Sequence, residues 1–272
     1  MSSKVDLCEI AKACRRDILT MIHAAGTGHP GGSLSATDIL CALYFGGILK
    51  HDAKNPEWEE RDRFILCKGH AAPALYAVLG EAGYFDKSEF DFLRKLGSHL
   101  QGHPDTLKCP GVEVSTGSLG QGLSISCGIA KAFKLQEADE SVFALLGDGE
   151  CQEGQVWEAA MFAAQNKLDN LIAIIDKNNL QIDGNVDDVM SLGNLTSKFI
   201  SFGWDVAQVD GHNMEALVGV LGDLKSEHAG KPKCLIAHTT KGKGVSFMEN
   251  QAGWHGKAPN DDEFEKAMEE LA

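Results

Sequence analysis

Two polar residues in the middle of the chain are spaced so that they could bind a metal ion together. Asp148 lies between two glycines after an apolar run at residues 142–146, and Asn178 follows a second apolar run at residues 171–175. The two runs predict buried strands, and the segment between them, about residues 154–167, predicts a helix. In such a unit the strands are parallel, and ligands bind beyond their carboxyl ends. Carboxylate and amide oxygens suit Mg²⁺ or Ca²⁺ better than zinc, so we expect a hard-cation site.

A purely structural explanation exists for each half of this pattern. Gly-Asp-Gly is a common turn, and Asn-Asn is a common exit from a strand, so either piece alone favours a structural role. Both pieces occur here at consecutive predicted strand ends with a helix between them, which favours a binding site. The glycines on either side of Asp148 would also let the backbone approach a ligand closely.

Histidines beside glycine form a second candidate group. The chain has 10 histidines, and those that lie next to a glycine include His29, His70, His103 and His255. Imidazoles held in tight turns can donate to hydroxyls and phosphate oxygens and can move protons near neutral pH. We therefore expect these four to converge on a polyhydroxylated, phosphorylated substrate. The remaining six are expected to be polar surface residues: His23, His51, His99, His212, His228 and His238.

Two glycine-rich segments have weaker signals. Residues 241–244, Lys-Gly-Lys-Gly, lack the spacing of a phosphate-binding P-loop, and we expect a mobile loop with two solvated lysines that could cover the site. Residues 116–122 contain glycines in the order G-x-x-G-x-G, which differs from the dinucleotide-binding fingerprint.

The segment from Gly147 to Gly184 resembles the thiamine diphosphate and metal-binding signature of the transketolase family. The match consists of Gly-Asp-Gly, about thirty residues, and then Asn-Asn. The resemblance covers nearly the whole chain, from His29 to the Trp-His-Gly-Lys-Ala-Pro segment. Three inner stretches look like the transketolase version of the signature: Gln152-Glu153-Gly154, Trp157-Glu158-Ala159 and Lys167-Leu168-Asp169-Asn170-Leu171.

The resemblance implies a set of binding residues for thiamine diphosphate and a divalent metal, Mg²⁺ or Ca²⁺. Asp148 and Asn178 would bind the metal through their side chains and Leu180 through its carbonyl. Gly149 would offer its N–H to the diphosphate, which bridges to the same ion. Leu119 and Ile182 would pack against the thiazolium region of the cofactor. The loop 116–122, which contains Gly117, would line the cofactor.

The resemblance also implies roles near the reacting atoms. Glu153 matches a glutamate near a subunit junction that supports the network activating the cofactor. His70 and His255 match a pair that approaches the diphosphate and the reaction centre, whereas His29 and His103 match residues that contact sugar hydroxyls. For Trp157 and Glu158, packing or capping of a helix is at least as good an explanation.

Composition restricts the class of protein. The chain has 272 residues with 25 Lys+Arg, 39 Asp+Glu and a formal net charge of -14. This charge disfavours nucleic-acid and anionic-membrane binding. The 8 cysteines include no C-x-x-C pair, and the N-terminus lacks the apolar stretch of a signal peptide. We therefore expect free thiols and a cytoplasmic location.

The pattern along the chain predicts an α/β fold with a doubly wound, mainly parallel sheet and helices on both faces. We expect a single thiamine-diphosphate-binding domain of the diphosphate-binding type over residues 1–272, with N-terminal helices at about 1–60 and an acidic tail at about 257–272. Glycine and proline at 26–32 should interrupt regular structure. The expected helices are about 7–22, 35–45, from 72, 122–134, 154–167, 214–227 and 261–272, and the expected strands are 63–67, 142–146, 171–175, 204–209 and 234–237.

The resemblance implies that this chain is incomplete as a catalyst. In the family, the glutamate that activates the aminopyrimidine ring and the residues that hold the sugar phosphate lie in a separate pyrimidine-binding domain. We expect either a naturally split transketolase, which works in an α₂β₂ assembly with a C-terminal subunit, or a truncated form of a longer enzyme, and we favour the first. The expected reaction moves a two-carbon ketol unit between sugar phosphates. The alternatives are a 2-oxo acid decarboxylating or 1-deoxyxylulose-5-phosphate synthase-like component, or a non-catalytic cofactor-binding module.

Overall fold

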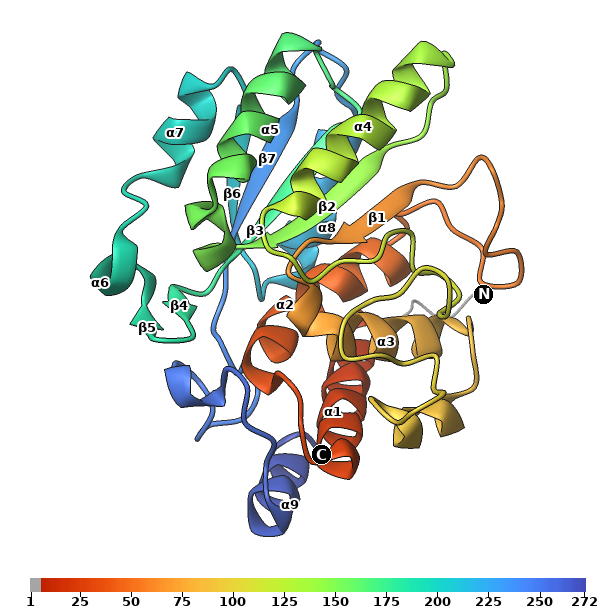
Figure 1. Cartoon of the computed structure of the whole chain (residues 1–272), viewed down its shortest axis with the longest axis vertical. Coiled ribbons are helices and arrows are strands. Elements are labelled where there is room, and N and C mark those ends of the chain that lie inside the picture. Colours follow the sequence, from red (N-terminus) through yellow and green to blue (C-terminus); the bar gives the residue numbers. More distant parts are fainter. Residues whose placement is uncertain (1–5) are drawn as a thin grey trace.

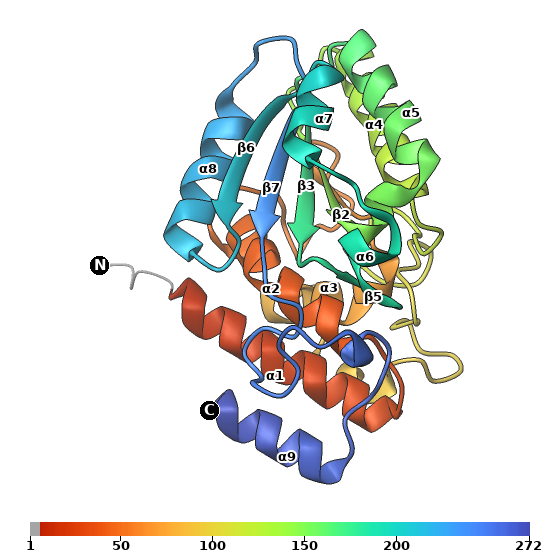
Figure 2. The ribbon, with the colours of Figure 1, turned by 90° about the vertical axis from the view of Figure 1, so that its left-hand side faces the viewer.

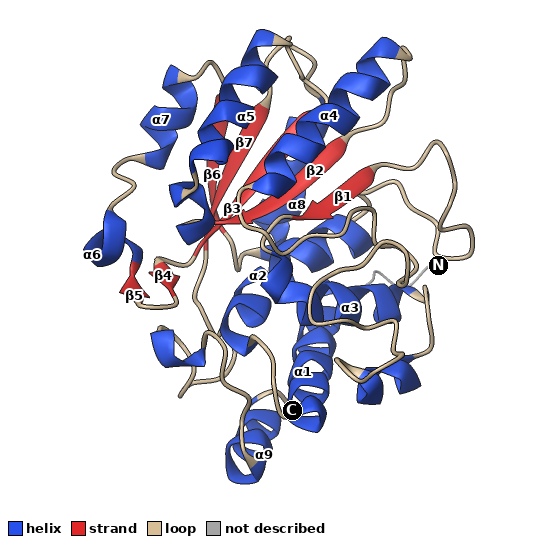
Figure 3. Cartoon of the chain, in the orientation of Figure 1, coloured by secondary structure: helices blue, strands red, loops and turns tan. Residues whose placement is uncertain are grey.

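A five-stranded parallel sheet forms the centre of the molecule (Figure 1, Figure 3). The computed structural model describes residues 6–272. The strands are β1 (Arg63–Leu66), β2 (Val142–Gly147), β3 (Leu171–Lys177), β6 (Asp205–Asp210) and β7 (Lys233–His238). Their order across the sheet is β1-β2-β3-β7-β6, and each neighbouring pair is parallel. The predicted strands are therefore confirmed, with boundaries that shift by one or two residues.

Side chains along each strand alternate between two hydrophobic cores, one on each face of the sheet. In β2, Phe143 and Leu145 belong to one core, whereas Val142, Ala144 and Leu146 belong to the other. This alternation follows from the two-residue period of a strand. Because both faces are covered, the strand reads as an uninterrupted apolar run in the sequence.

Helices cover both faces of the sheet, as the side view in Figure 2 shows. One core is closed by α1 (Leu7–Ala25), α2 (Pro30–Phe45), α3 (Ala72–Ala82) and α8 (Met214–Ser226). The other core is closed by α4 (Gln121–Leu135), α5 (Gly154–Gln165) and α7 (Leu195–Ser201). The prediction of a parallel sheet between two helical layers is confirmed. No helix within residues 6–272 has the length and apolar character needed to cross a membrane.

The acidic tail forms helix α9 (Asp261–Glu270), close to the predicted boundaries. This helix is acidic, but it docks on α1 instead of lying free on the surface. The ring of Phe264 stacks on His23 at 4.2 Å between centroids, and Arg16 Nη1 donates to the Leu271 carbonyl at 2.6 Å. Ala267 is fully buried in the same contact.

Short elements surround the carboxyl ends of β2 and β3. The chain leaves β3 into a small antiparallel hairpin and a one-turn helix, which the sequence analysis did not predict. They are β4 (Leu180–Gln181), β5 (Gly184–Asn185) and α6 (Val186–Met190). Among the described residues, 3₁₀ turns at Gly69–Ala71, Gly149–Gln152 and Ala252–Trp254 carry or adjoin cavity residues, whereas the turn at Lys87–Phe92 packs on α1.

The prediction that the second helix begins at residue 35 is wrong, because α2 begins at Pro30. Proline is well tolerated in the first turn of a helix, where its missing N–H has no intrahelical partner. Gly31 and Gly32 both lie within the helix. A Cβ atom on Gly31 would lie 2.9 Å from the Trp254 carbonyl oxygen and 3.0 Å from Lys241 Cγ. Gly31 therefore allows other groups to approach the helix closely and does not interrupt it.

Two glycines in α4 provide a matched test of the packing of this helix on the sheet. A Cβ on Gly122 would lie 2.6 Å from Cys67 Sγ, whereas a Cβ on Gly128 would meet nothing within 4 Å. We predict that Gly122→Ala lowers the free energy of unfolding by about 1–3 kcal/mol through overpacking. Gly128→Ala should instead raise it by about 0.5–1 kcal/mol through helix propensity. Urea unfolding of both variants checks this, and equal effects of the same sign would contradict it.

Candidate active site

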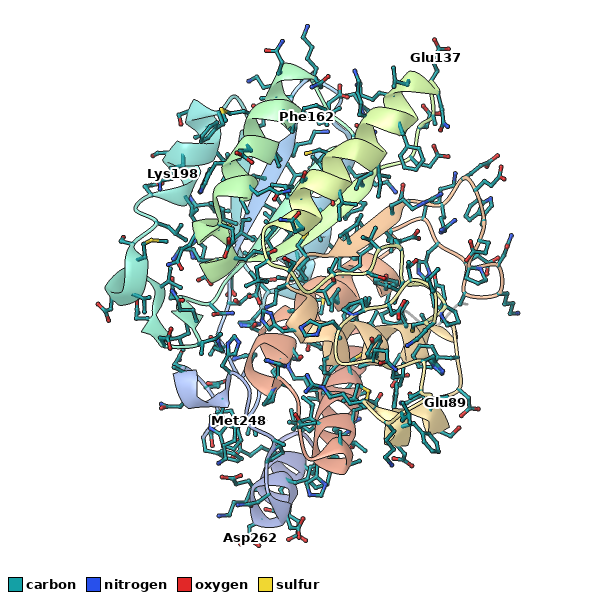
Figure 4. The ribbon with its side chains drawn as sticks, in the orientation of Figure 1. Glu89, Glu137, Phe162, Lys198, Met248 and Asp262 are labelled. Atoms are coloured by element: carbon teal, nitrogen blue, oxygen red, sulfur yellow. The ribbon has the colours of Figure 1, made fainter. Side chains whose placement is uncertain are left out.

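A cavity of about 320 Å³ lies at the carboxyl ends of β2 and β3. The loop that carries Met248 lies on this side of the sheet, whereas Glu137 and Phe162 lie toward the opposite ends of α4 and α5 (Figure 4). Every site residue that the sequence indicated lines this cavity: His29, His70, His103, Gly117, Leu119, Asp148, Gly149, Glu153, Asn178, Leu180, Ile182 and His255.

Asp148 and Asn178 lie side by side because their strands are neighbours in register. Gly147 pairs with Asp176 across β2 and β3, so each strand ends at the same level. Asp148 is buried, and its carboxylate accepts hydrogen bonds from the N–H groups of Gly149 at 2.8 Å and Asn179 at 2.5 Å. Burial, together with the nearby Asp176 carboxylate, raises the pKa of Asp148 to about 6. A cation at this position would relieve that unfavourable environment.

The donor set fits a hard divalent cation. It consists of the Asp148 carboxylate, the Asn178 side-chain oxygen and the carbonyl of Leu180, all at the cavity wall. Lys241 Nζ lies 3.2 Å from the Leu180 carbonyl oxygen, so this oxygen already accepts from a positive group. Across residues 6–272, no three His, Cys, Asp or Glu side chains lie close enough to hold a metal ion. Oxygen ligands of this kind suit Mg²⁺ or Ca²⁺.

Asp176 connects four segments behind the cavity, and the sequence analysis missed it. Its carboxylate is fully buried and accepts from Ser35 Oγ at 2.6 Å, from Lys68 Nζ at 2.5 Å and from the Thr239 hydroxyl. Burial would raise the pKa of Asp176, but the charge of Lys68 and these hydrogen bonds outweigh it and hold the pKa below its usual value. In the sequence, Asp176 is only the first polar residue after the predicted strand 171–175, so its role is visible in the fold alone.

Asp176 also orients the amide of Asn178. Asn178 Nδ2 lies 3.4 Å from Asp176 Oδ2 and 3.3 Å from Ser35 Oγ, whereas Asn178 Oδ1 accepts from the Leu180 N–H at 3.1 Å. The nitrogen of the amide thus faces two acceptors, which leaves the oxygen as the atom available at the cavity.

Three of the four histidines form a compact cluster. Ring centroids are 5.4 Å apart for His29 and His70, 5.4 Å for His29 and His255, and 5.1 Å for His70 and His255. His103 lies against the backbone of Gly117, where a Cβ would be 2.9 Å from His103 Cδ2. The predicted convergence of glycine-flanked histidines is therefore seen in the geometry.

All four imidazoles are held in their neutral form. Burial is the main cause in each case. It lowers the pKa of His29 to about 4 with help from the charge of Arg94, and that of His255 to about 3 with help from Lys241. Burial and Lys68 lower the pKa of His70, and burial and Arg94 lower that of His103. At neutral pH these rings offer one N–H donor and one acceptor each.

The prediction that residues 241–244 form a mobile loop with two solvated lysines is wrong for Lys241. This side chain is 2% exposed and lines the cavity, and its Nζ lies 2.9 Å from His255 Nδ1. Burial and the charge of Lys68 lower the pKa of Lys241 to about 8. Lys243 remains half-exposed and pairs with Glu249 at 3.5 Å. Packing of the lysine stem against Gly31, which the sequence does not reveal, explains the difference.

Two further residues at the cavity were missed. Lys68 is 1% exposed and donates to the Gly32 carbonyl at 2.9 Å as well as to Asp176. Glu150 is buried and accepts from the N–H groups of Gly120 at 3.0 Å and Gly147 at 3.2 Å. Burial raises the pKa of Glu150 to about 7. The adjacent Glu153, which the sequence did indicate, is exposed at the rim.

Two charge substitutions should separate the causes of the histidine pKa values. Lys241→Met should raise the pKa of His255 more than that of His29, since the Lys241 charge ranks directly after burial for His255. Arg94→Met should raise the pKa of His29 and His103 and leave that of His255 nearly unchanged. NMR titration of the imidazole rings measures both, and equal responses to the two variants would contradict the assignment.

Comparison with known proteins shows the family to which the chain belongs. The chain matches the family "Transketolase, thiamine diphosphate binding domain" over residues 8–272. It is 44% identical to an apulose-4-phosphate transketolase subunit of Phocaeicola vulgatus, over 95% of this chain and 91% of that protein. It is 42% identical to the 6-deoxy-6-sulfo-D-fructose transketolase subunit SqwG of Clostridium sp., over 98% of this chain and 97% of that protein.

Solved structures show the same fold. Transketolase from Campylobacter jejuni superposes with a TM-score of 0.90 at 36% sequence identity, over 97% of this chain and 42% of that chain. The Pichia stipitis enzyme superposes with a TM-score of 0.92 at 30% identity, over 41% of its own chain. This chain thus spans about two fifths of the length of these transketolases. The sequence and the structure together show that the chain belongs to the transketolase family and corresponds to the thiamine diphosphate-binding domain of its members.

Proposed function

We propose that this chain is the thiamine diphosphate-binding subunit of a split transketolase, which transfers a two-carbon ketol unit from a ketose phosphate to an aldose phosphate. One observation carries the proposal: Asp148, Asn178 and the four glycine-flanked histidines line one cavity, in a chain that belongs to the transketolase family. The relatives of similar length are named as transketolase subunits. We propose a single domain of the diphosphate-binding type for the whole chain.

The diphosphate end of the cofactor would be held at the strand ends. Asp148, Asn178 and the Leu180 carbonyl would bind Mg²⁺, and Gly149 would donate its N–H to the diphosphate. Together with the metal ion, the buried ammonium groups of Lys68 and Lys241 would place positive charge beside the diphosphate in a chain with a net charge of -14. A buried charge acts at short range with little screening, so the overall acidity does not oppose the binding of an anion here.

The histidines would act as neutral hydrogen-bonding groups. His255 Nδ1 faces the Lys241 ammonium, and His29 Nδ1 lies 3.3 Å from Arg94 Nη2. Both contacts make Nδ1 the acceptor, so Nε2 carries the proton in each ring. Such N–H groups can donate to the hydroxyl or carbonyl oxygens of a sugar, and His70 and His103 would complete this wall. When bound, thiamine diphosphate supplies the electron sink for carbon–carbon bond cleavage.

A partner subunit would complete the site. We propose that it brings the glutamate that activates the aminopyrimidine ring and the groups that bind the sugar phosphate, in an α₂β₂ assembly. Exposed apolar side chains beside the cavity support a covering partner: Ile182 is 67% exposed and Met190 is 54% exposed. Glu153 at the rim would lie at that junction. The eight cysteines are unpaired, which supports a reducing compartment such as the cytoplasm.

We predict that Asp148→Ala abolishes Mg²⁺-dependent binding of thiamine diphosphate by the assembled subunits, because it removes the charged metal ligand. Asp183→Ala changes an exposed carboxylate in the nearby hairpin turn and serves as the control. Titration calorimetry with Mg²⁺ and thiamine diphosphate measures both. Retained metal-dependent binding by Asp148→Ala would remove the ligand assignment.

A second prediction concerns the reaction itself. The chain assembled with its partner subunit should transfer a ketol unit from xylulose 5-phosphate to ribose 5-phosphate or act on a related sugar, whereas the chain alone should show no turnover. Apulose 4-phosphate and 6-deoxy-6-sulfofructose, the sugars in the names of the two relatives, should be tested as substrates in the same assay. A coupled spectrophotometric assay reports product. Turnover of pyruvate without turnover of any of these sugars would overturn the transketolase proposal.

A further inference from the structure

A line of buried hydrogen bonds connects α1 and α2 to the loop that carries Lys241. Arg15 on α1 is 6% exposed and Asp38 on α2 is 5% exposed. The guanidinium donates to both carboxylate oxygens of Asp38, from Nη2 at 2.7 Å and from Nη1 at 3.1 Å. Two parallel contacts of this kind fix the orientation of the carboxylate and stabilise its ionised form.

His212 continues the line from Asp38 to the backbone of Thr240. His212 Nδ1 lies 2.6 Å from Asp38 Oδ2, and the Thr240 N–H donates to His212 Nε2 at 2.8 Å. Since Asp38 can only accept and the Thr240 N–H can only donate, the ring must carry its proton on Nδ1. The expectation that His212 is a polar surface residue is therefore wrong, because its side chain is 14% exposed and both nitrogens are used.

The ionised form of Asp38 is needed for this arrangement. Burial alone would raise the pKa of Asp38, but the hydrogen bond from His212 and the charge of Arg15 outweigh burial and hold the pKa below its ordinary value. Asp38 therefore stays an acceptor near neutral pH, and it selects the tautomer of His212 that accepts from Thr240.

The same residues hold the loop on the other side of Lys241. Arg15 Nε donates to the Lys243 carbonyl at 3.1 Å. Between the two anchors the chain turns at Gly242, which has a φ of 80° and where a Cβ would lie 2.4 Å from the Met248 carbonyl oxygen. Hydrogen bonds thus hold the backbone before and after Lys241, and the turn between them requires glycine at position 242.

We propose that Arg15, Asp38 and His212 are positioning residues for the active site: they fix Thr240 and Lys243 and thereby hold the Lys241 ammonium in the cavity beside His255 and the Leu180 carbonyl. Among the residues described, the cavity wall includes Lys241 but none of these three side chains. The proposal assigns their effect on a ligand to Lys241, and not to Thr239, whose hydroxyl donates to Asp176. This inference rests on the proposed function, which makes thiamine diphosphate the ligand of the cavity.

A double-mutant cycle in the chain assembled with its partner tests this route. The Kd for thiamine diphosphate with Mg²⁺ is measured by calorimetry for wild type, His212→Phe, Lys241→Met and the double variant. We expect His212→Phe to weaken binding about tenfold, as the loss of one positioning hydrogen bond would. In the Lys241→Met background, His212→Phe should add almost nothing. If the Kd of the double variant rises by the product of the fold-changes seen in the two single variants, the proposal is overturned.

A structural readout accompanies the binding measurement. Hydrogen exchange of the Thr240 amide, followed by mass spectrometry or NMR, should speed up in His212→Phe, since its acceptor is gone. The matched control is His51→Phe, because His51 is another half-buried histidine whose nitrogens contact Tyr84 and Tyr44 and not Asp38 or Thr240. The control should leave both the Thr240 exchange rate and the Kd unchanged. Unchanged exchange in His212→Phe, or weakened binding in the control, would contradict the inference.

A milder variant keeps the test decisive if His212→Phe does not fold. His212→Asn keeps a donor for Asp38 but has no atom at the position of Nε2, so it removes the contact with Thr240 alone. It should reproduce the faster exchange and the weaker binding. If wild type itself fails to bind thiamine diphosphate, the proposed function is wrong; if wild type binds and His212→Asn binds equally well, the positioning role is wrong.

Discussion

The ion pair between Lys68 and Asp176 is the interaction on which the site depends. Both groups are buried, and a buried charge without its partner costs several kcal/mol, about 3–5 by comparison with other proteins. The pair is tolerated because Ser35, Thr239 and Gly32 satisfy the remaining hydrogen-bonding capacity of the two groups. As a result, segments from α2, from the end of β1, and from the ends of β3 and β7 are fixed relative to one another.

The local charge of the cavity differs from that of the whole chain. Lys68 and Lys241 are buried at the strand ends, and Arg94 lies beside His29, whereas the net charge of -14 is spread over the whole chain. The acidic groups near the cavity, Asp148 and Glu150, each accept backbone N–H groups. Neutral histidines between these charges can then bind polar oxygens without repelling a cation. The cavity thus combines hard oxygen groups, ammonium groups and neutral imidazoles.

Local patterns in the sequence predicted the fold and indicated Asp148, Asn178 and the four histidines. The other predicted site residues were indicated only by the resemblance to the transketolase family: Gly117, Leu119, Gly149, Glu153, Leu180 and Ile182. Uninterrupted apolar runs mark strands that are buried on both faces, and turn sequences such as Gly-Asp-Gly and Asn-Asn mark the strand ends where ligands bind. Asp148 and Asn178 carry such signals. Lys68, Asp176 and Glu150 do not, since their roles come from partners distant in the sequence. Lys241 looked like a solvated loop residue because charged residues in glycine-rich loops usually are, and only the packing across α2 buries it.

Gly31, in the first turn of α2, restricts how the amino-acid sequence of this protein can change. The stem of Lys241 passes within about van der Waals contact of Gly31, where any Cβ would crowd both Lys241 Cγ and the Trp254 carbonyl. A smaller residue at position 241, more than 200 positions away in the sequence, would relieve only the contact with its own side chain, because the contact with Trp254 is to the backbone. A side chain at position 31 should therefore be rejected even when position 241 changes with it. Shape thus restricts position 31 to glycine, because the first turn of α2 lies against both the stem of a buried lysine and a backbone carbonyl.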